Sequence, residues 1–350
     1  MVKISKTAKN NTFTYVLVIV AFIAAQAAQN AGVMSSSLKG QLVPICAYVV
    51  MAVSLNLTVG ILGELSLGHA GFMSVGAFSG VIAAAALQSA IPVPGVRLVV
   101  SMIFGAVFAG LAGILIGIPV LRLKGDYLAI VTLAFGEIVM NIINCLYVGV
   151  DSRGLHFSIL KDAGALNLES TGRIIINGPV GASGITQIST FAGGFILIMI
   201  TLVIVQNLVN SRTGRAILAV RDNRISAESV GISVTRYKMT AFVVSAVLAG
   251  ASGVLFALNS DTVVPTKFNF NTSILILVFV VLGGLGNIWG SIIAAAVLTI
   301  LPEALRGFNS YRMLVYAIVL ILVMILTNSR ILKSAWGRLS LHRGAGRVER

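Results

Sequence analysis

Charged residues are scarce in this chain. Only 10% of its 350 residues are charged and 57% are hydrophobic, and the mean hydropathy is +0.99. Soluble globular domains carry about 25% charged and roughly 45–50% apolar residues. So few charges cannot cover a water-facing surface. The composition therefore excludes a soluble enzyme and indicates a protein with many membrane-spanning segments.

Cysteines and catalytic motifs are equally sparse. The two cysteines, Cys46 and Cys145, lie in apolar runs without a CxxC spacing or a histidine partner, so we predict neither a disulfide framework nor a metal site. The sequence has no Gly-Lys dipeptide, which excludes a P-loop, and no HExxH motif or Ser/His/Asp set. We predict no catalytic residue, no metal and no cofactor in this chain.

Nine apolar runs are candidates for membrane segments, because about 20 apolar residues cross the hydrocarbon core. They lie near residues 13–34, 41–61, 69–89, 97–121, 127–148, 190–209, 239–258, 274–301 and 313–328. The polar stretch 149–189 between the fifth and sixth runs predicts an extramembrane loop. We treat residues 13–328 as one transmembrane domain.

The positive charge of the chain follows its topology. The net charge is +14, but the cations stand at the ends of apolar runs, which is typical of topology signals and of contact with anionic lipid rather than nucleic acid. With residues 1–12, Arg122, Lys124, residues 210–238 and the basic tail 329–350 in the cytoplasm, 17 of the 25 Lys and Arg residues lie inside. This orientation predicts two cytoplasmic termini and an external 149–189 loop.

Two cytoplasmic termini require an even number of crossings, which nine runs do not give. The glycine-rich residues 283–287 predict a break within the run 274–301. We therefore expect an all-α polytopic membrane protein with about ten transmembrane segments, one or two of them broken or re-entrant. Residues 60–65 and 283–288 share the pattern G-x-L-G-polar-apolar, which favours two repeated halves and points to a substrate region. Close helix packing or chance is the alternative.

Several polar residues within or beside the apolar runs are candidates for lining a translocation pathway. Glu64 either faces a cavity or a partner or caps the following helix, and His69 is either a pathway residue or a hydrogen-bonded packing residue. Glu137, Asn141 and Asn144 share a helical spacing that predicts a polar stripe facing the bundle interior, either for interhelical hydrogen bonds or for a pathway. The candidates are Glu64, Ser66, His69, Thr132, Glu137, Asn141, Gly284 and Asn287.

The segment 211–238 is too polar to insert into a membrane. Its apolar residues Ile217, Val220, Ile225 and Val230 have helical spacing, and Gly231 is a helix stop. A surface helix with one apolar side meets either lipid or another protein. The basic excess favours lipid, whereas the acidic and polar residues and the glycine end favour a groove in a partner.

Four groups of residues together resemble the membrane permeases of branched-chain amino acid ABC importers, of the LivM type. They are residues 55–70, 121–138, 214–232 and 281–290. The resemblance runs from about residue 40 to about residue 327. It implies a helical permease that works with a second related permease, two cytoplasmic ATPase subunits that hold ATP and Mg²⁺, and an extracellular or periplasmic substrate-binding protein. It also implies localisation in the bacterial inner membrane.

The resemblance further implies that residues 215–231 form the coupling helix that docks into an ATPase groove. The residues expected to couple the chain to the ATPase are Arg215, Arg221, Asp222, Asn223, Glu228 and Gly231. Residues 176–185 depart from the Thr-Gly-Gly-Pro-Asn-Gly-Ile pattern common in the family. A branched-chain amino acid is the expected substrate, with urea or another amide as the alternative. An ion-coupled secondary transporter is the rival from another class.

Overall fold

A computed structural model describes most of the chain. The described residues are 6–32, 34–88, 90–122, 127–151, 154–159, 166, 172–305, 311, 314–315, 317–318 and 320–321. The chain divides into two compact units, residues 1–296 and 297–350. The tail 329–350 and most of the run 313–328 lie outside the described residues, as do Lys124 and much of the polar stretch 149–189.

Helices dominate the structure. The α-helices are α1 (Lys6–Asn30), α2 (Ser36–Asn56), α3 (His69–Ala86), α4 (Pro94–Val120), α5 (Tyr127–Asn144), α6 (Phe191–Asn210), α7 (Arg212–Asp222), α8 (Arg224–Ser229), α9 (Val234–Ala257), α10 (Phe270–Gly283) and α11 (Ile288–Ala304). A π-helical segment, η1 (Leu57–Leu62), continues α2, and two short 3₁₀ segments are η3 (Gly178–Val180) and η4 (Pro265–Phe268). Hydroxyl side chains cap several starts. Ser35 accepts a hydrogen bond from Leu38 N, and Thr190 accepts one from Gly193 N.

Six of the described helices are long and apolar enough to cross a membrane, and three shorter apolar helices accompany them. The six include α2 with η1, α3, α4, α5, α6 and α9. The structure therefore confirms a helical membrane protein with several spans. The predicted total of about ten segments stays a prediction. The expected break in the run 274–301 is present, because α10 ends at Gly283 and α11 begins at Ile288.

Helix α9 lies at the centre of the first unit, where α2, α3 and α4 pack against it. Gly76, Gly105 and Gly250, from α3, α4 and α9, meet at one crossing, where a Cβ on any of them would overlap a neighbour. Small residues at such crossings let helices approach closely where lipid offers no hydrophobic driving force. The outward side of α4 carries exposed apolar side chains such as Phe104 and Leu115, as expected of a lipid-facing surface.

The helical fold also contains one small sheet that the sequence analysis did not predict. A five-stranded antiparallel sheet has the order β2-β1-β3-β4-β5. Its strands are β1 (Leu146–Asp151), β2 (Gly154–Ile159), β3 (Arg173–Asn177), β4 (Ala182–Ser183) and β5 (Thr262–Val263). Val148 pairs with Phe157 on one side and Ile176 on the other. The apolar end of the predicted run 127–148 thus forms a strand, and β5 joins the sheet from beyond α9.

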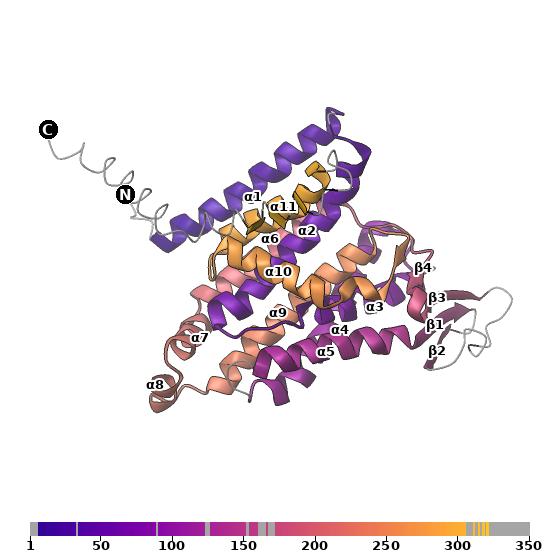
Figure 1. The fold of residues 1–350 in the computed structure, drawn as a ribbon. Coiled ribbons are helices and arrows are strands. Elements are labelled where there is room, and N and C mark those ends of the chain that lie inside the picture. The colour runs from indigo at the N-terminus through magenta and orange to yellow at the C-terminus, as the bar shows by residue number, and fades with distance from the viewer. Residues whose placement is uncertain are drawn as a thin grey trace. The chain divides into compact units, whose positions relative to one another are not determined.

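The sheet and the polar helices α7 and α8 lie at opposite ends of the helical bundle in the first unit (Figure 1). Helix α5 ends and α6 begins at the sheet, whereas α6 ends and α9 begins at α7 and α8. The two polar regions found in the sequence are therefore separated by the length of the apolar helices.

Candidate functional site

The first glycine turn, residues 60–64, ends the second helix of the bundle. Helix α2 passes into η1 without interruption, and the π-helix stops at Gly63, which has φ +79°. Gly63 N and Glu64 N both lie near Thr58 O, and Glu64 N donates to it at 3.1 Å. A positive φ is readily adopted only by glycine. Short π-helical insertions occur frequently at functional sites.

The second glycine turn, residues 283–287, separates α10 from α11. Gly284 and Gly286 have φ of +94° and +79°. Asn287 N donates to Gly284 O at 2.9 Å, and Ser291 N donates to Asn287 O at 3.2 Å as α11 begins. Gly63 and Gly286 occupy the same position of the shared sequence pattern and adopt the same φ. The turns differ at the second position of the pattern, because Ile61 lies in the π-helix whereas Gly284 has φ +94°. The repeat of two halves stays a prediction.

The two glycine turns contact each other. Asn56, which is fully buried in the last turn of α2, accepts a hydrogen bond from Gly286 N at 2.8 Å and donates one to Ser291 Oγ at 3.1 Å. A Cβ at Gly60 would overlap both Asn56 Oδ1 and Gly286 N, so only glycine allows this approach. One side chain thereby links the end of α2 to the start of α11.

Helix α7 packs on the first glycine turn. Ile217 is buried in a cluster with Leu57, Ile61, Leu62 and Ala241. Val220 and Ala227 are also buried, in a second cluster with Val234. In contrast, Ile225 and Val230 are 79% and 74% exposed. The expectation of one apolar side was therefore wrong: the first two apolar positions hold the helix to the bundle, and the last two face away from it.

The residues expected to couple the chain to an ATPase lie on or beside α7 and α8. Arg221 Nη1 donates to Gly60 O at 3.3 Å, and its Nη2 pairs with Asp222 at 2.9 Å. Asn223 ends α7 and caps α8, because its Oδ1 accepts from Ser226 N at 3.0 Å. The predicted single helix is therefore two. Glu228 pairs with Arg224 at 3.1 Å, and the exposed Gly231 has φ +84°.

Arg215 is exposed and donates to Asn210 O at 3.4 Å. Of the six residues expected here, only Arg221 reaches the bundle core, through Gly60. Its side chain also lies across Gly63, whose Cβ would stand 2.7 Å from Arg221 Cγ. Arg221 is thus a direct contact between the surface helices and the first glycine turn.

Glu64 forms an ion pair with Lys238 in the first turns of α9, and both side chains are largely buried. The capping alternative for Glu64 was wrong, because the N-cap of α3 is Gly68 and receives no side-chain hydrogen bond. Ser66 is buried, and its hydroxyl has no hydrogen-bond partner among the described residues. His69 is buried, and its Nε2 lies 2.7 Å from Ser54 Oγ, as expected of a hydrogen-bonded packing residue.

The candidates on α5 point in different directions. Thr132 is buried, and its Oγ1 accepts from Leu67 N at 3.1 Å. Glu137 is half-buried, and its Oε1 accepts from Phe270 N at 3.2 Å, which places the carboxylate at the start of α10. Asn141 is exposed and donates to Glu137 O at 2.8 Å. Asn141 therefore lies outside the interior of this chain, contrary to the expected inward-facing stripe.

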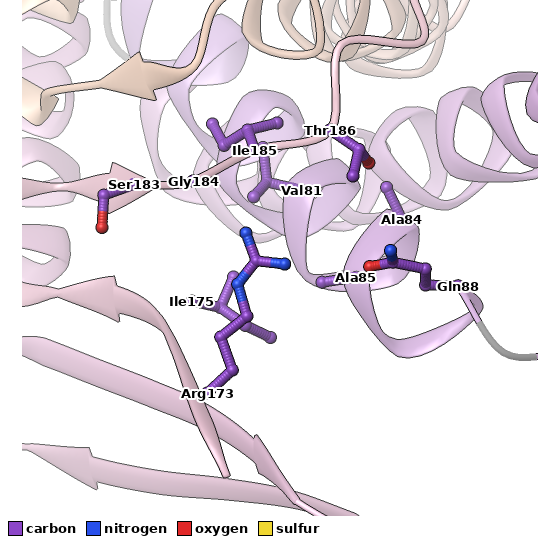
Figure 2. Close-up of a pocket in the computed structure, with 10 residues that line it drawn as sticks. All are labelled: Val81, Ala84, Ala85, Gln88, Arg173, Ile175, Ser183, Gly184, Ile185 and Thr186. Carbon is purple, nitrogen blue, oxygen red and sulfur yellow. The ribbon is translucent and has the colours of Figure 1, made fainter. Parts of the chain in front are cut away.

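A small pocket lies at the sheet end of α3 (Figure 2). Arg173 extends its guanidinium into it, opposite Val81 and Ala85 of α3 and the segment Ser183 to Thr186. A Cβ at Gly184, which has φ +63°, would stand 2.6 Å from Arg173 Nη2. The residues that depart from the family pattern therefore contribute to a defined pocket with a basic group.

Sequence reasoning missed three residues that contact the glycine turns. Asn56, Ser291 and Lys238 were absent from the candidates, although Asn56 is a polar residue inside an apolar run four positions before Gly60. Their partners lie far away in the sequence, so local spacing could not pair them. Helical periodicity alone could not predict that Ile225 and Val230 are exposed while Ile217 and Val220 are buried.

Comparison with known proteins decides the family. Residues 37–324 match the profile of the family described as "Branched-chain amino acid transport system / permease component". The chain belongs to this permease family. Both glycine turns, α7, α8 and all eight pathway candidates lie within the matched residues.

Individual relatives agree with this assignment. The permease is 33% identical to the high-affinity branched-chain amino acid transport system permease protein LivM of Escherichia coli, over 86% of this chain and 71% of that protein. It is also 33% identical, with the same coverage, to LivM of Salmonella typhimurium. A probable ABC transporter permease protein of E. coli, YphD, is 29% identical over 38% of this chain and 42% of its own length. No solved structure matches the permease.

Proposed function

We propose that this permease is the membrane subunit of an ATP-driven ABC importer in a bacterial inner membrane. It forms half of a translocation pathway, which a second related permease completes. Two cytoplasmic ATPases, which hold ATP and Mg²⁺, drive transport, and a soluble binding protein delivers the substrate. The family and the names of the relatives support this assignment, together with the separation of the sheet from α7 and α8 by the apolar helices.

The observation that carries the proposal is the apolar side of α8. Ile225 in α8 and Val230 directly after it are exposed, while Ile217 and Val220 of α7 are buried and pack α7 against the bundle. Exposed apolar side chains on a polar, anchored helix are typical of a docking surface. Asp222 and Glu228 offset the charges of Arg221 and Arg224 through ion pairs, which weakens the attraction of this segment to an anionic lipid surface. We therefore place the ATPase on α8.

The pathway is placed along the outward side of α5. Glu137 and Asn141 lie in a membrane-spanning helix, yet Asn141 is exposed and Glu137 is only half-buried. Polar groups at membrane depth face protein or a water-filled cavity rather than lipid. The second permease and the aqueous pathway together satisfy this requirement. The buried candidates Thr132 and His69 then support the pathway wall instead of lining it.

The proposed substrate is a branched-chain amino acid, because both LivM relatives are named for that transport. Competition measures this directly. In proteoliposomes that contain the permease and its partners, uptake of labelled leucine should be inhibited by isoleucine and valine and unaffected by urea. Inhibition by urea, with no effect of valine, would assign the amide alternative instead.

Docking on α8 is tested with Ile225→Asp. The new carboxylate should prevent an apolar contact with the ATPase, so that co-purification of the ATPase and ATP-dependent uptake are both lost while the amount of permease in the membrane is unchanged. Thr235→Asp is the matched control, because Thr235 is also exposed and lies just beyond the surface helices. Thr235→Asp should retain both co-purification of the ATPase and ATP-dependent uptake.

The competing explanations predict different results. If α8 is instead a lipid-binding helix, Ile225→Asp will reduce binding to anionic vesicles and leave ATPase binding intact. If the chain is an ion-coupled carrier, uptake will proceed without ATPase subunits and will be abolished by an uncoupler. Either result would contradict the proposed function.

A further inference from the structure

Helix α7 contacts the first glycine turn, and the first turn contacts the second. Arg221 Nη1 bonds Gly60 O, and Ile217 packs on Leu57, Ile61 and Leu62. These contacts fix α7 to η1. Whatever displaces α7 must therefore displace η1 with it.

The next step passes through Asn56 at the start of η1. Its side-chain oxygen accepts a hydrogen bond from Gly286 N, and its side-chain nitrogen donates one to Ser291 Oγ. Both ends of the amide therefore bond to the second turn and the start of α11. Gly60 lies against Asn56 Oδ1 and the backbone of Gly286, with no room for a Cβ. The contact is therefore both polar and steric, and η1 cannot shift toward Gly286 without moving it.

On the other side of this contact, the chain is broken into two helices, α10 and α11. Gly284 and Gly286 both have positive φ, and Leu285 and Gly286 are exposed. At the other end of α10, Phe270 N donates a hydrogen bond to Glu137 of α5. A break of this kind can change the angle between α10 and α11 at a few dihedral angles, as hinges do.

We propose that Asn56 is the positioning residue that transmits the movement of α7 and α8 to the break between α10 and α11. This inference rests on the proposed function, because it takes the ATPase as the source of the movement. Asn56 does not contact the ATPase and need not contact the substrate. Its role is to keep the two glycine turns moving together, so that ATP hydrolysis and reorientation of α10 and α11 remain coupled.

The first test uses the reconstituted complex of the permease with its ATPases, partner permease and binding protein. We expect Asn56→Ala and Gly60→Ala to lower the number of substrate molecules transported per ATP hydrolysed by about five-fold or more, the lower end of common allosteric coupling factors. Ser291→Ala should give a smaller decrease, because Asn56 keeps its bond to Gly286 N. A purely structural role would lower uptake and ATP hydrolysis together and leave their ratio unchanged.

Matched controls separate coupling from packing. Gly40→Ala lies on the same helix, in open space, and Gly253→Ala forces a backbone overlap elsewhere, against Met73 O of α3. Ser252→Ala removes a buried hydrogen bond to Ala47 O of α2. These three variants should keep the wild-type ratio of transport to ATP hydrolysis, even where the amount of complex falls. An equal decrease in the ratio in Ser252→Ala or Gly253→Ala would overturn the proposal.

A second measurement follows the break itself. Leu285→Cys, in a background without Cys46 and Cys145, places a thiol at an exposed position of the second turn. Its rate of maleimide labelling should change when the complex traps ATP, and this change should disappear with Asn56→Ala. If labelling still follows the nucleotide in Asn56→Ala, the inference is wrong. If instead the wild-type complex shows no ATP-dependent uptake, the proposed function fails.

Discussion

The two glycine turns share a sequence pattern and the φ of one glycine but differ in their surroundings. Gly63 and Gly286 both have φ +79°. The first turn is covered by Arg221 and continues into the buried ion pair of Glu64 with Lys238. The second is exposed at Leu285 and Gly286 and is held mainly through Asn56. Glycine at the shared position thus allows the same positive φ in both turns, whereas the neighbouring residues cover the first turn more fully than the second.

The largest effect is expected from breaking the anchor of the first turn. Lys238→Met leaves the largely buried Glu64 carboxylate without its partner and should destabilise the permease by about 3–5 kcal/mol. Thermal unfolding of the purified permease in detergent measures this. The double variant Glu64→Gln with Lys238→Met should recover most of the loss, because no unpaired charge remains.

A matched control for that pair is available on α8. Arg224→Met breaks the Arg224–Glu228 pair, whose side chains are 40% and 50% exposed, and should cost no more than about 0.5 kcal/mol. A similar cost for Arg224→Met and Lys238→Met would show that the first turn is not anchored by a buried charge pair. The comparison between the turns would then lose its main physical basis.

A smaller effect should separate the two glycines directly. Gly286→Ala places a Cβ no closer than 3.4 Å to Gly60 O, so only the left-handed backbone penalty of about 1–2 kcal/mol applies. Gly63→Ala carries the same penalty and an overlap with Arg221 in addition. Gly63→Ala should therefore unfold at the lower temperature. Adding Arg221→Ala should reduce the difference in unfolding temperature between the two variants. If the difference stays the same, the role given to Arg221 is wrong.

The sequence predicted the features of the fold that depend on local chemistry. Apolar runs located the main membrane helices, and the glycine cluster at 283–287 located the break between α10 and α11. The match between residues 60–65 and 283–288 identified two turns that the structure brings into contact. In each of these cases the signal is a property of consecutive residues, such as hydropathy or the freedom of glycine at positive φ.

The sequence could not predict features that depend on distant partners. Glu64 was weighed as a helix cap because its neighbours favour one, but its partner Lys238 is 174 positions away. The sheet was missed because β1 begins inside the apolar run 127–148, and because β4 and β5 have only two residues each and β5 comes from beyond α9. The split between α7 and α8 depends on the cap at Asn223, a residue that was expected to contact the ATPase and not to end a helix. Roles of the site residues in transport remain predictions.

The smallest effects are expected at the start of α10, where Phe270 contacts Glu137 of α5. Glu137→Ala removes the acceptor for Phe270 N and should destabilise the permease by about 1 kcal/mol, the usual cost of losing a helix cap. Asn141→Ala should cost less than about 0.5 kcal/mol, because Asn141 is exposed and bonds only its own helix. Uptake should nevertheless fall clearly in Glu137→Ala at normal membrane levels, since the start of α10 is no longer fixed while its other end moves at the glycine turn. Glu137→Gln, which keeps an acceptor oxygen, should retain most of the uptake. If Glu137→Gln and Glu137→Ala are equally impaired, the charge of the carboxylate matters and not its hydrogen bond to α10, and Glu137 then acts in the pathway itself.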